Sequence, residues 1–199
     1  MIFPDTLYGL VLSGGKSIRM GTDKGLITYH NKPQREYVYD LLAKVCNKTF
    51  LSIRPNQLDE VSKKFEFIAD EDEFSGPFNG ILSAHKKHPK VAWLVLACDL
   101  PLMKIEALEV LISKRNRSKL ATAFALKENP LPEPLAAIWE AKGLSRALDF
   151  KKSEQGTGPR KFLVHHDVEL VFPKDDNVLL NANSESEYVH ALKLVSSYE

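Results

Sequence analysis

The chain has 199 residues, 44% hydrophobic and 27% charged, which suits one globular domain that we expect to span residues 1–199. The formal net charge is +1, so the molecule as a whole has no general attraction for nucleic acids or acidic membranes. No apolar stretch approaches the roughly 20 residues of a membrane-spanning helix, and we expect no signal peptide because the first residues lack a basic region and a cleavage site. The two cysteines, Cys46 on a predicted helix and Cys98 at a buried strand end, favour thiols in a reducing cytoplasm.

Apolar runs alternate with segments of helical periodicity along most of the chain. This alternation predicts an α/β fold: a single Rossmann-like, three-layer α/β/α domain with a mostly parallel sheet. The expected strands are Leu7–Leu12, Thr49–Ile53, Phe65–Ile68, Val91–Ala97, Leu120–Leu126, Leu135–Trp139 and Val168–Phe172, with a short extended piece at Leu26–Tyr29. The expected helices are Pro33–Cys46, Gly76–His88, Lys104–Arg115, Lys142–Phe150 and Glu185–Val195, and Lys151–Arg160 is predicted to be a loop.

A glycine pair, Gly14 and Gly15, follows the first strand, and three cations, Lys16, Arg19 and Lys24, come after it. Glycines allow the backbone to approach a ligand closely, and exposed N–H groups in such a loop form an anion site. The spacing matches neither the P-loop nor the dinucleotide-binding fingerprint. We therefore expect a nucleoside triphosphate here, with Arg19 and Lys24 on its phosphates and Lys16 as a weaker candidate. The alternative is a solvated surface turn.

Asp99 follows the apolar run Val91–Ala97, with Cys98 between them. Open parallel sheets bind ligands at the carboxyl ends of their strands, so we expect Asp99 and the first loop to share one edge of the sheet. A carboxylate in such a crevice suits Mg²⁺, which takes one or two carboxylates together with substrate phosphates and water. The alternative is that Asp99 caps the helix that begins near Lys104.

Four segments carry a family resemblance that covers nearly the whole chain. They are Leu12–Lys24, with the pattern Leu-x-Gly-Gly-x-Ser-x-Arg-Met-Gly-x-Asp-Lys, and the later segments Gly76–Ile81, Leu96–Pro101 and Asn181–Glu187. Together they resemble the molybdenum cofactor guanylyltransferases, a branch of the nucleotidyltransferase superfamily. Ser13 stands where that family usually has Ala, and Ser184 and Ser186 stand where it has Thr and Pro.

The resemblance implies an enzyme that transfers GMP from GTP to molybdopterin with Mg²⁺ as cofactor and releases pyrophosphate. Because the acceptor is itself a phosphate monoester, positioning and charge neutralisation suffice, and no strong general base is needed. The resemblance also implies transient docking to other cofactor-biosynthesis proteins or to molybdoenzymes, with no nucleic-acid or membrane partner. Two alternatives stay open: a related nucleotidyltransferase that uses CTP or a sugar-phosphate acceptor, and a non-catalytic nucleotide-binding module.

The resemblance further implies which residues contact the nucleotide. The main chain of Leu12, Gly14 and Gly15 would contact the base and ribose, and the glycine pair would help to select guanine. Asp70 matches the family's nucleotide-contacting Asp, although Asp72 in the same acidic stretch stays possible because the spacing varies. The catalytic residues would be Arg19, Lys24 and Asp99, with Asp99 as the metal ligand and Lys24 and Asp99 also on the nucleotide.

Asn181 and Asn183 flank a single residue, so in an extended segment their side chains point the same way. The resemblance implies that both lie near the pterin substrate and the metal. The alternative, which does not exclude this role, is that Asn183 or Ser184 caps the terminal helix.

The remaining candidates are weaker. His85 and His88 share a predicted helix face, and we expect both in solvent rather than on a metal. Cys98 has no convincing partner base and is expected to be a packed core thiol. Arg160 and Lys161 are candidate contacts for a second anionic substrate.

Overall fold

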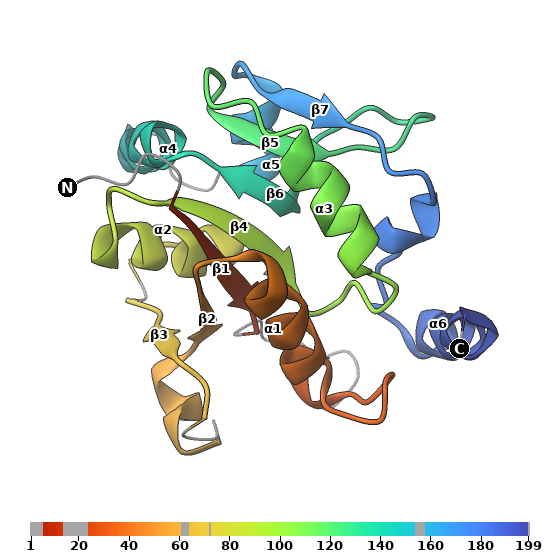
Figure 1. Ribbon diagram of the computed structural model, residues 1–199. Coiled ribbons are helices and arrows are strands. Elements are labelled where there is room, and N and C mark those ends of the chain that lie inside the picture. Colours follow the sequence, from red (N-terminus) through yellow and green to blue (C-terminus); the bar gives the residue numbers. More distant parts are fainter. Residues whose placement is uncertain (1–5, 14–23, 61–63, 72, 154–157, 199) are drawn as a thin grey trace.

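The computed structural model describes residues 6–13, 24–60, 64–71, 73–153 and 158–198 (Figure 1). The strands are β1 (Leu7–Leu12), β2 (Lys48–Ile53), β3 (Phe67–Ala69), β4 (Ala92–Ala97), β5 (Ala121–Phe124), β6 (Glu133–Trp139) and β7 (Glu169–Val171). The α-helices are α1 (Gln34–Val45), α2 (Pro77–Lys87), α3 (Ile105–Ser113), α4 (Ala141–Ser153), α5 (Pro159–Val164) and α6 (Glu185–Tyr198). Three short 3₁₀ helices are η1 (Lys24–Leu26), η2 (Pro55–Glu60) and η3 (Asp176–Leu179).

The seven strands form one sheet in the order β3-β2-β1-β4-β6-β5-β7. The first four strands of this order run parallel, and β6 is antiparallel to both of its neighbours. In the centre, Leu12 at the end of β1 pairs with Ser52 on one side and Ala97 on the other. The predicted α/β fold with a mostly parallel sheet is confirmed. The carboxyl ends of β1, β2 and β4 meet at one edge, and Asp99, which follows β4, lies there as predicted.

Helices cover both faces of the sheet, because successive strand residues point to opposite sides. In Figure 1, α1 and α3 lie in front of the sheet, and α2, α4 and α5 lie behind it. On β1, Val11 packs in the core under α1 and α3, whereas Leu10 packs with α2, α4 and α5 on the other face. Trp93 and Trp139 are fully buried on that second face. The result is the predicted three-layer domain.

The C-terminal helix α6 lies apart from these layers and packs on a smaller core (Figure 1). That core joins Ala191 and Val195 of α6 to Tyr29, which precedes α1, and to Leu102, which follows β4. Tyr29 meets Tyr188 edge to face at 5.1 Å between ring centroids. The last helix is thus attached directly beside the carboxyl end of β4.

Several local predictions need correction. The segment Lys151–Arg160, predicted as a loop, contains the end of α4 and the start of α5, because Phe162 supplies an apolar anchor that the local composition did not reveal. The third strand begins at Phe67 rather than Phe65, and Phe65 instead packs on Tyr39. The extended piece at Leu26–Tyr29 is only an isolated bridge between Thr28 and Pro33, after the turn η1.

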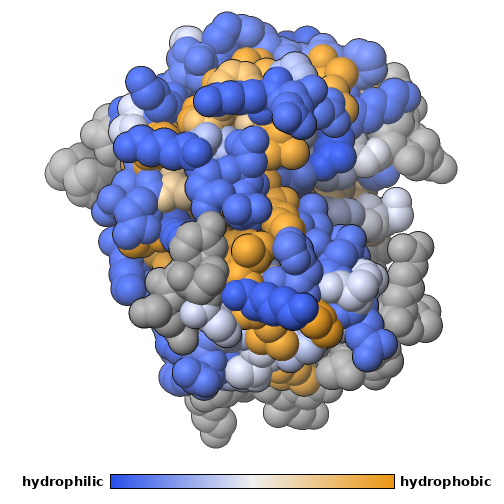
Figure 2. All heavy atoms as spheres, turned by 90° about the vertical axis from the view of Figure 1, so that its right-hand side faces the viewer, coloured by the Kyte–Doolittle hydropathy of each residue, from blue (hydrophilic) through white to orange (hydrophobic). Residues whose placement is uncertain are grey.

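Hydrophilic residues cover most of the molecular face in Figure 2, and hydrophobic residues show as a band between them. Within the described ranges, no helix combines the length and the apolar character that crossing a membrane would require.

Candidate active site

The candidate site lies along the edge where the parallel strands end. Ser13 continues directly from β1, and its N–H and hydroxyl both face the Ser52 carbonyl, at 3.2 and 3.3 Å. On the other side, the Cys98 N–H donates to the Leu12 carbonyl at 3.3 Å. The exit of β1 is therefore held between β2 and β4, immediately before the predicted nucleotide loop.

Asp70 joins this edge from β3. Its N–H donates to the Ile53 carbonyl at 2.8 Å, and one of its carboxylate oxygens accepts a hydrogen bond from the Ser52 hydroxyl at 2.7 Å. Ser52 and Asp70 are both buried. Ser52 thus connects two predicted nucleotide contacts, since its carbonyl holds the residue after Leu12 and its hydroxyl holds Asp70.

Helix α2 supports the acidic stretch that Asp70 begins. The Ser83 hydroxyl accepts a hydrogen bond from the Glu71 N–H at 3.0 Å, and the side-chain amide oxygen Oδ1 of Asn79 accepts one from the Phe74 N–H at 3.1 Å. Lys86, one turn further along, pairs with two carboxylates, Glu71 at 2.7 Å and Glu73 at 2.6 Å. These residues recur at helical spacing on one face of α2, so the helix fixes the segment that follows β3.

Gly80 lets α2 approach this edge. A Cβ atom at this position would lie 2.2 Å from the Ser52 hydroxyl oxygen, 2.9 Å from Leu12 Cδ2 and 3.3 Å from a carboxylate oxygen of Asp70. Only glycine fits without displacing one of these groups. The predicted Gly76–Ile81 motif therefore has a packing function at Gly80, directly against two candidate site residues.

Asp99 lies at the carboxyl end of β4 and is half-buried. Its carbonyl accepts a hydrogen bond from the Ala182 N–H at 3.0 Å, which brings Asn181 and Asn183 to the same edge although they are distant in sequence. Helix α3 begins at Ile105 and its N-cap residue is Lys104. The alternative prediction, that Asp99 caps this helix, is therefore wrong.

The terminal helix α6 is capped by Ser184. The Glu187 N–H donates to the Ser184 hydroxyl at 3.3 Å, and the Glu187 carboxylate accepts from the Ser184 and Asn183 N–H groups at 2.9 and 2.7 Å. This reciprocal arrangement is a capping box. Since Ser184 performs the capping, the cap does not require the side chain of Asn183.

Other predicted residues fall outside the part of the chain that the structure describes. They are Gly14, Gly15, Lys16, Arg19 and Asp72. Lys24 begins the short helix η1, and only its backbone is described. The roles assigned to these residues stay predictions.

Two residues of this region were missed by sequence reasoning. Tyr29 is buried, and this burial, together with Tyr188, Cys98 and Asp99, raises its pKa well above the ordinary value. Arg54 directly follows β2, and its Nε is buried without a hydrogen-bond partner among the described residues. A cation immediately after an apolar strand was the available signal for Arg54, whereas the position of Tyr29 depends on long-range packing.

The weaker candidates from the sequence lie in different surroundings in the structure. The prediction that His85 lies in solvent is wrong: His85 is buried because α4 covers this face of α2, and its Nε2 lies 3.2 Å from the Ser145 hydroxyl oxygen. This burial lowers the pKa of His85. Cys98 is buried, which confirms a packed core thiol. Arg160 is ion-paired with Glu133 on the protein surface.

Asp99 and the Asn181–Asn183 segment offer oxygen atoms of the kind that Mg²⁺ prefers as ligands. Among residues 6–13, 24–60, 64–71, 73–153 and 158–198, no group of three or more His, Cys, Asp or Glu side chains is arranged to hold a metal. Asp99 supplies a hard carboxylate, and the Asn181–Asn183 segment beside it offers amide oxygens. Mg²⁺ usually combines one or two carboxylates with phosphate oxygens and water. These residues therefore fit Mg²⁺ that arrives with a nucleotide.

The seven-stranded fold and a matching family model together place this domain in the nucleotidyltransferase class. The crystal structure of molybdopterin-guanine dinucleotide biosynthesis protein A from Archaeoglobus fulgidus has this fold, with a TM-score of 0.76 at 23% identity over 96% of this chain and 99% of that chain. The family model described as the MobA-like NTP transferase domain matches residues 9–170. The chain belongs to that family.

Two relatives carry more specific names. A molybdenum cofactor biosynthesis bifunctional protein of Synechocystis sp. is 38% identical over 186 residues, which are 92% of this chain and 52% of that protein. The chain therefore spans about half the length of this bifunctional relative. A probable molybdenum cofactor guanylyltransferase of Flavobacterium johnsoniae is 32% identical over 138 residues, which are 69% of this chain and 70% of that protein.

Proposed function

We propose that this protein transfers GMP from GTP to the terminal phosphate of molybdopterin and releases pyrophosphate. The observation that carries the proposal is the main-chain bond from Ala182 to Asp99, which joins the Asn181–Asn183 segment to the edge that holds Leu12 and Asp70. A donor site and an acceptor site can then share one carboxylate. The name of the Flavobacterium johnsoniae relative supports guanylyl transfer, and the name of the Archaeoglobus fulgidus protein supports molybdopterin and guanine.

Each residue has a distinct role in this proposal. Arg19 and Lys24 would neutralise the charge that develops on the leaving pyrophosphate. Mg²⁺, held by Asp99 together with phosphate oxygens and water, would add positive charge at the triphosphate. The acceptor phosphate would attack the α-phosphorus in line, so the protein has to supply orientation and electrostatic stabilisation rather than a strong base.

The remaining residues would bind the two substrates. The main chain of Leu12, Gly14 and Gly15 would contact the base and ribose, and Asp70 would contact the nucleotide. Asn181 and Asn183 would orient the acceptor beside the metal. The proposed nucleotide contacts of Leu12 and Asp70 are supported by their place on either side of Ser52.

The cellular setting is part of the same proposal. We place the reaction in the cytoplasm, supported by Cys46 and Cys98, which both remain thiols. Transient docking to another protein of cofactor biosynthesis is supported by the bifunctional Synechocystis relative. The match covers only about half of that relative, so the relative carries a further part that this chain does not match.

The first experiment is a thermal-shift panel with GTP, CTP, ATP and UTP, each with and without Mg²⁺. A ligand at about a hundredfold excess over its Kd stabilises the folded state by about 2.7 kcal/mol, which is roughly 5 to 10 °C for a domain of this size. We expect this shift for GTP and an increase with Mg²⁺. A larger shift with CTP would mean that the enzyme uses cytosine rather than guanine nucleotides. The absence of a shift with every nucleotide would favour a non-catalytic module.

Turnover is then measured as pyrophosphate release from GTP and molybdopterin. Asp99→Ala and Lys24→Ala are expected to abolish release while the thermal midpoint without ligand stays close to that of the wild type. Asp149→Ala and Lys90→Ala, at exposed positions on α4 and before β4, are matched controls that should stay active. A fully active Asp99→Ala protein would refute the metal assignment.

A further inference from the structure

The loop that follows Asp99 is held by three side chains, one from the segment just before α1 and two from the first turn of α1. His30 Nε2 donates to the Pro101 carbonyl at 2.8 Å, which requires the proton on this nitrogen because a carbonyl can only accept. The Gln34 amide donates to the Leu100 carbonyl at 3.4 Å. The Tyr37 hydroxyl donates to the carbonyl of Met103 at 3.2 Å. We call these three side chains the α1 clamp.

Both the donor side chains of the α1 clamp and the loop residues that accept from them are fixed by packing. The rings of His30 and Tyr37 stack at 3.7 Å between centroids with 13° between their planes. Gln34 is fully buried, and Leu100 and Met103 are at most 1% exposed. Because the carbonyls of Leu100, Pro101 and Met103 are each held by a buried or stacked donor, the backbone that follows Asp99 has little freedom to rotate.

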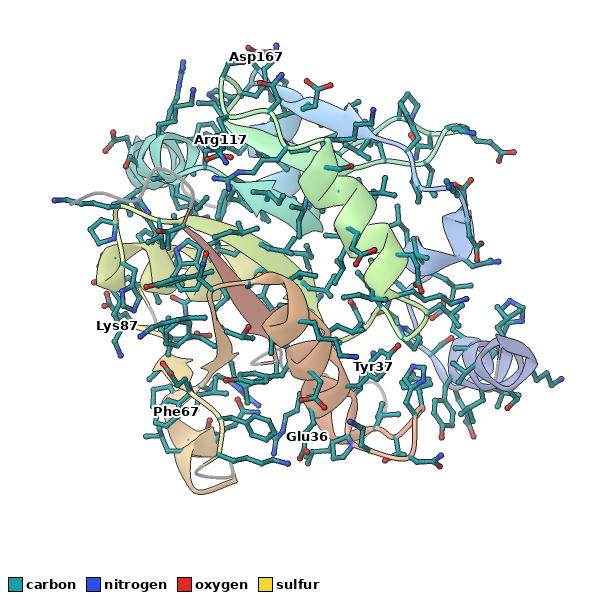
Figure 3. All side chains as sticks on the ribbon, viewed as in Figure 1. Glu36, Tyr37, Phe67, Lys87, Arg117 and Asp167 are labelled. Atoms are coloured by element: carbon teal, nitrogen blue, oxygen red, sulfur yellow. The ribbon has the colours of Figure 1, made fainter. Side chains whose placement is uncertain are left out.

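The clamp adjoins the loop after Asp99, and Asp99 in turn holds the Asn181–Asn183 segment. His30 follows closely after Lys24 in the chain, and the loop it holds starts at Asp99. The Asp99 carbonyl in turn holds the Ala182 N–H at 3.0 Å. Figure 3 labels Tyr37 between α1 and α6, where it also lines a cavity of about 310 Å³ with Val195 of α6.

We propose that His30, Gln34 and Tyr37 are positioning residues that set the location of Asp99 and, through its carbonyl, of the Asn181–Asn183 segment. A ligating carboxylate has to be held within about 0.5 Å of its productive position by the groups around it. The clamp does this without touching the substrates, through the main chain on the carboxyl side of Asp99. The part that concerns Mg²⁺ rests on the proposed function, whereas the part that concerns Ala182 does not.

The variants are chosen so that the clamp is weakened in steps. Tyr37→Phe removes one hydroxyl oxygen and keeps the ring stack. His30→Ala removes a donor and enlarges a cavity that already exists, while His30→Gln keeps a donor. Tyr39→Phe is the matched control on the same helix, since the Tyr39 hydroxyl faces Glu66 rather than the loop.

The first readout is amide hydrogen exchange at Ala182 in the protein without any ligand. Loss of one hydrogen bond from the clamp is expected to speed exchange at Ala182 by about two- to tenfold in Tyr37→Phe and in His30→Ala. Tyr39→Phe should exchange like the wild type, and His30→Gln should fall between the wild type and His30→Ala. A merely structural loss of stability would instead accelerate exchange across the β4 amides as well.

The second readout is metal binding, with Mn²⁺ as the probe, measured by electron paramagnetic resonance in the presence of GTP. Loss of a group that orients a metal ligand typically costs about 10- to 100-fold in affinity, and we expect an effect at the lower end for His30→Ala. GTP binding without metal should stay at the wild-type level. Pyrophosphate release should need proportionally more Mg²⁺.

The two readouts separate the possible failures. Unchanged Ala182 exchange in the His30→Ala/Tyr37→Phe double variant would overturn the clamp, whatever the protein binds. If the wild type fails to bind GTP, the proposed function fails, and the exchange measurement still decides whether the clamp exists. If His30→Ala does not fold, the single-atom change in Tyr37→Phe decides the question.

Discussion

Replacing Gly80 with alanine should disturb two candidate site residues at once. The new Cβ would lie 2.2 Å from the Ser52 hydroxyl oxygen, far inside contact distance, so that hydroxyl has to rotate away. Its hydrogen bond to the buried carboxylate of Asp70, 2.7 Å long, would be lost. Leu12, at 2.9 Å, would have to yield as well.

The magnitude follows from these contacts. Overpacking a tight interior typically costs about 1 to 3 kcal/mol. The lost hydrogen bond to a charged group adds about 1.5 to 3 kcal/mol. Alanine regains up to about 1 kcal/mol of helix propensity in α2. We therefore expect Gly80→Ala to lower the free energy of unfolding by about 1.5 to 5 kcal/mol.

Urea denaturation followed by tryptophan fluorescence measures this change, because Trp93 and Trp139 are both fully buried. The decisive comparison is a double-mutant cycle with Ser52→Ala, which removes the oxygen that the new Cβ would strike. The Gly80→Ala/Ser52→Ala protein should be less destabilised than the sum of the two single variants. Additive effects, or a Gly80→Ala protein as stable as the wild type, would refute the steric argument.

Three further predictions concern other parts of the fold. Burial lowers the pKa of His85, so the stability from its neutral form is fully present above about pH 6.5 and is lost as the pH falls through the lowered pKa; His85→Gln should flatten this pH dependence of the thermal midpoint. Arg115→Met should cost about 3 to 5 kcal/mol in urea denaturation, because it leaves the carboxylate of Glu140 buried without its two-pronged partner at 2.7 and 2.9 Å, and a second change, Glu140→Leu, should restore most of the loss. Ser184→Ala should cost about 1 kcal/mol and speed amide exchange only in the first turn of α6, whereas Ser196→Ala, near its other end, should leave that turn unchanged.

Periodicity and local composition predicted most elements to within a few residues. The apolar run at Leu7–Leu12 matches β1, and the helical spacing after Pro33 matches α1. Strong local patterns succeed because burial of one helix face or of a whole strand leaves a direct trace in the sequence. The short helix α5 was missed because its formation depends on Phe162, which packs against Trp139 of a distant strand.

The site was predictable only in part. Asp99 and the glycine pair could be found because both follow apolar strands, and parallel strands bring such positions to one edge. The sequence alone does not reveal that the Ala182 N–H meets the Asp99 carbonyl, or that Ser52 lies between Leu12 and Asp70. These contacts join residues from separate elements, and their geometry depends on strand order and helix packing.

The amino-acid sequence by itself determined the α/β class, the alternation of strands and helices, and the residue types at the carboxyl edge of the sheet, since each has a local chemical signature. Only the tertiary structure decided the antiparallel place of β6, the burial of His85 and the hold of the α1 clamp on the loop after Asp99. Each of these features depends on packing or hydrogen bonding between residues that are far apart in the chain. Such contacts have no local signature in the sequence and are set only when the elements pack together.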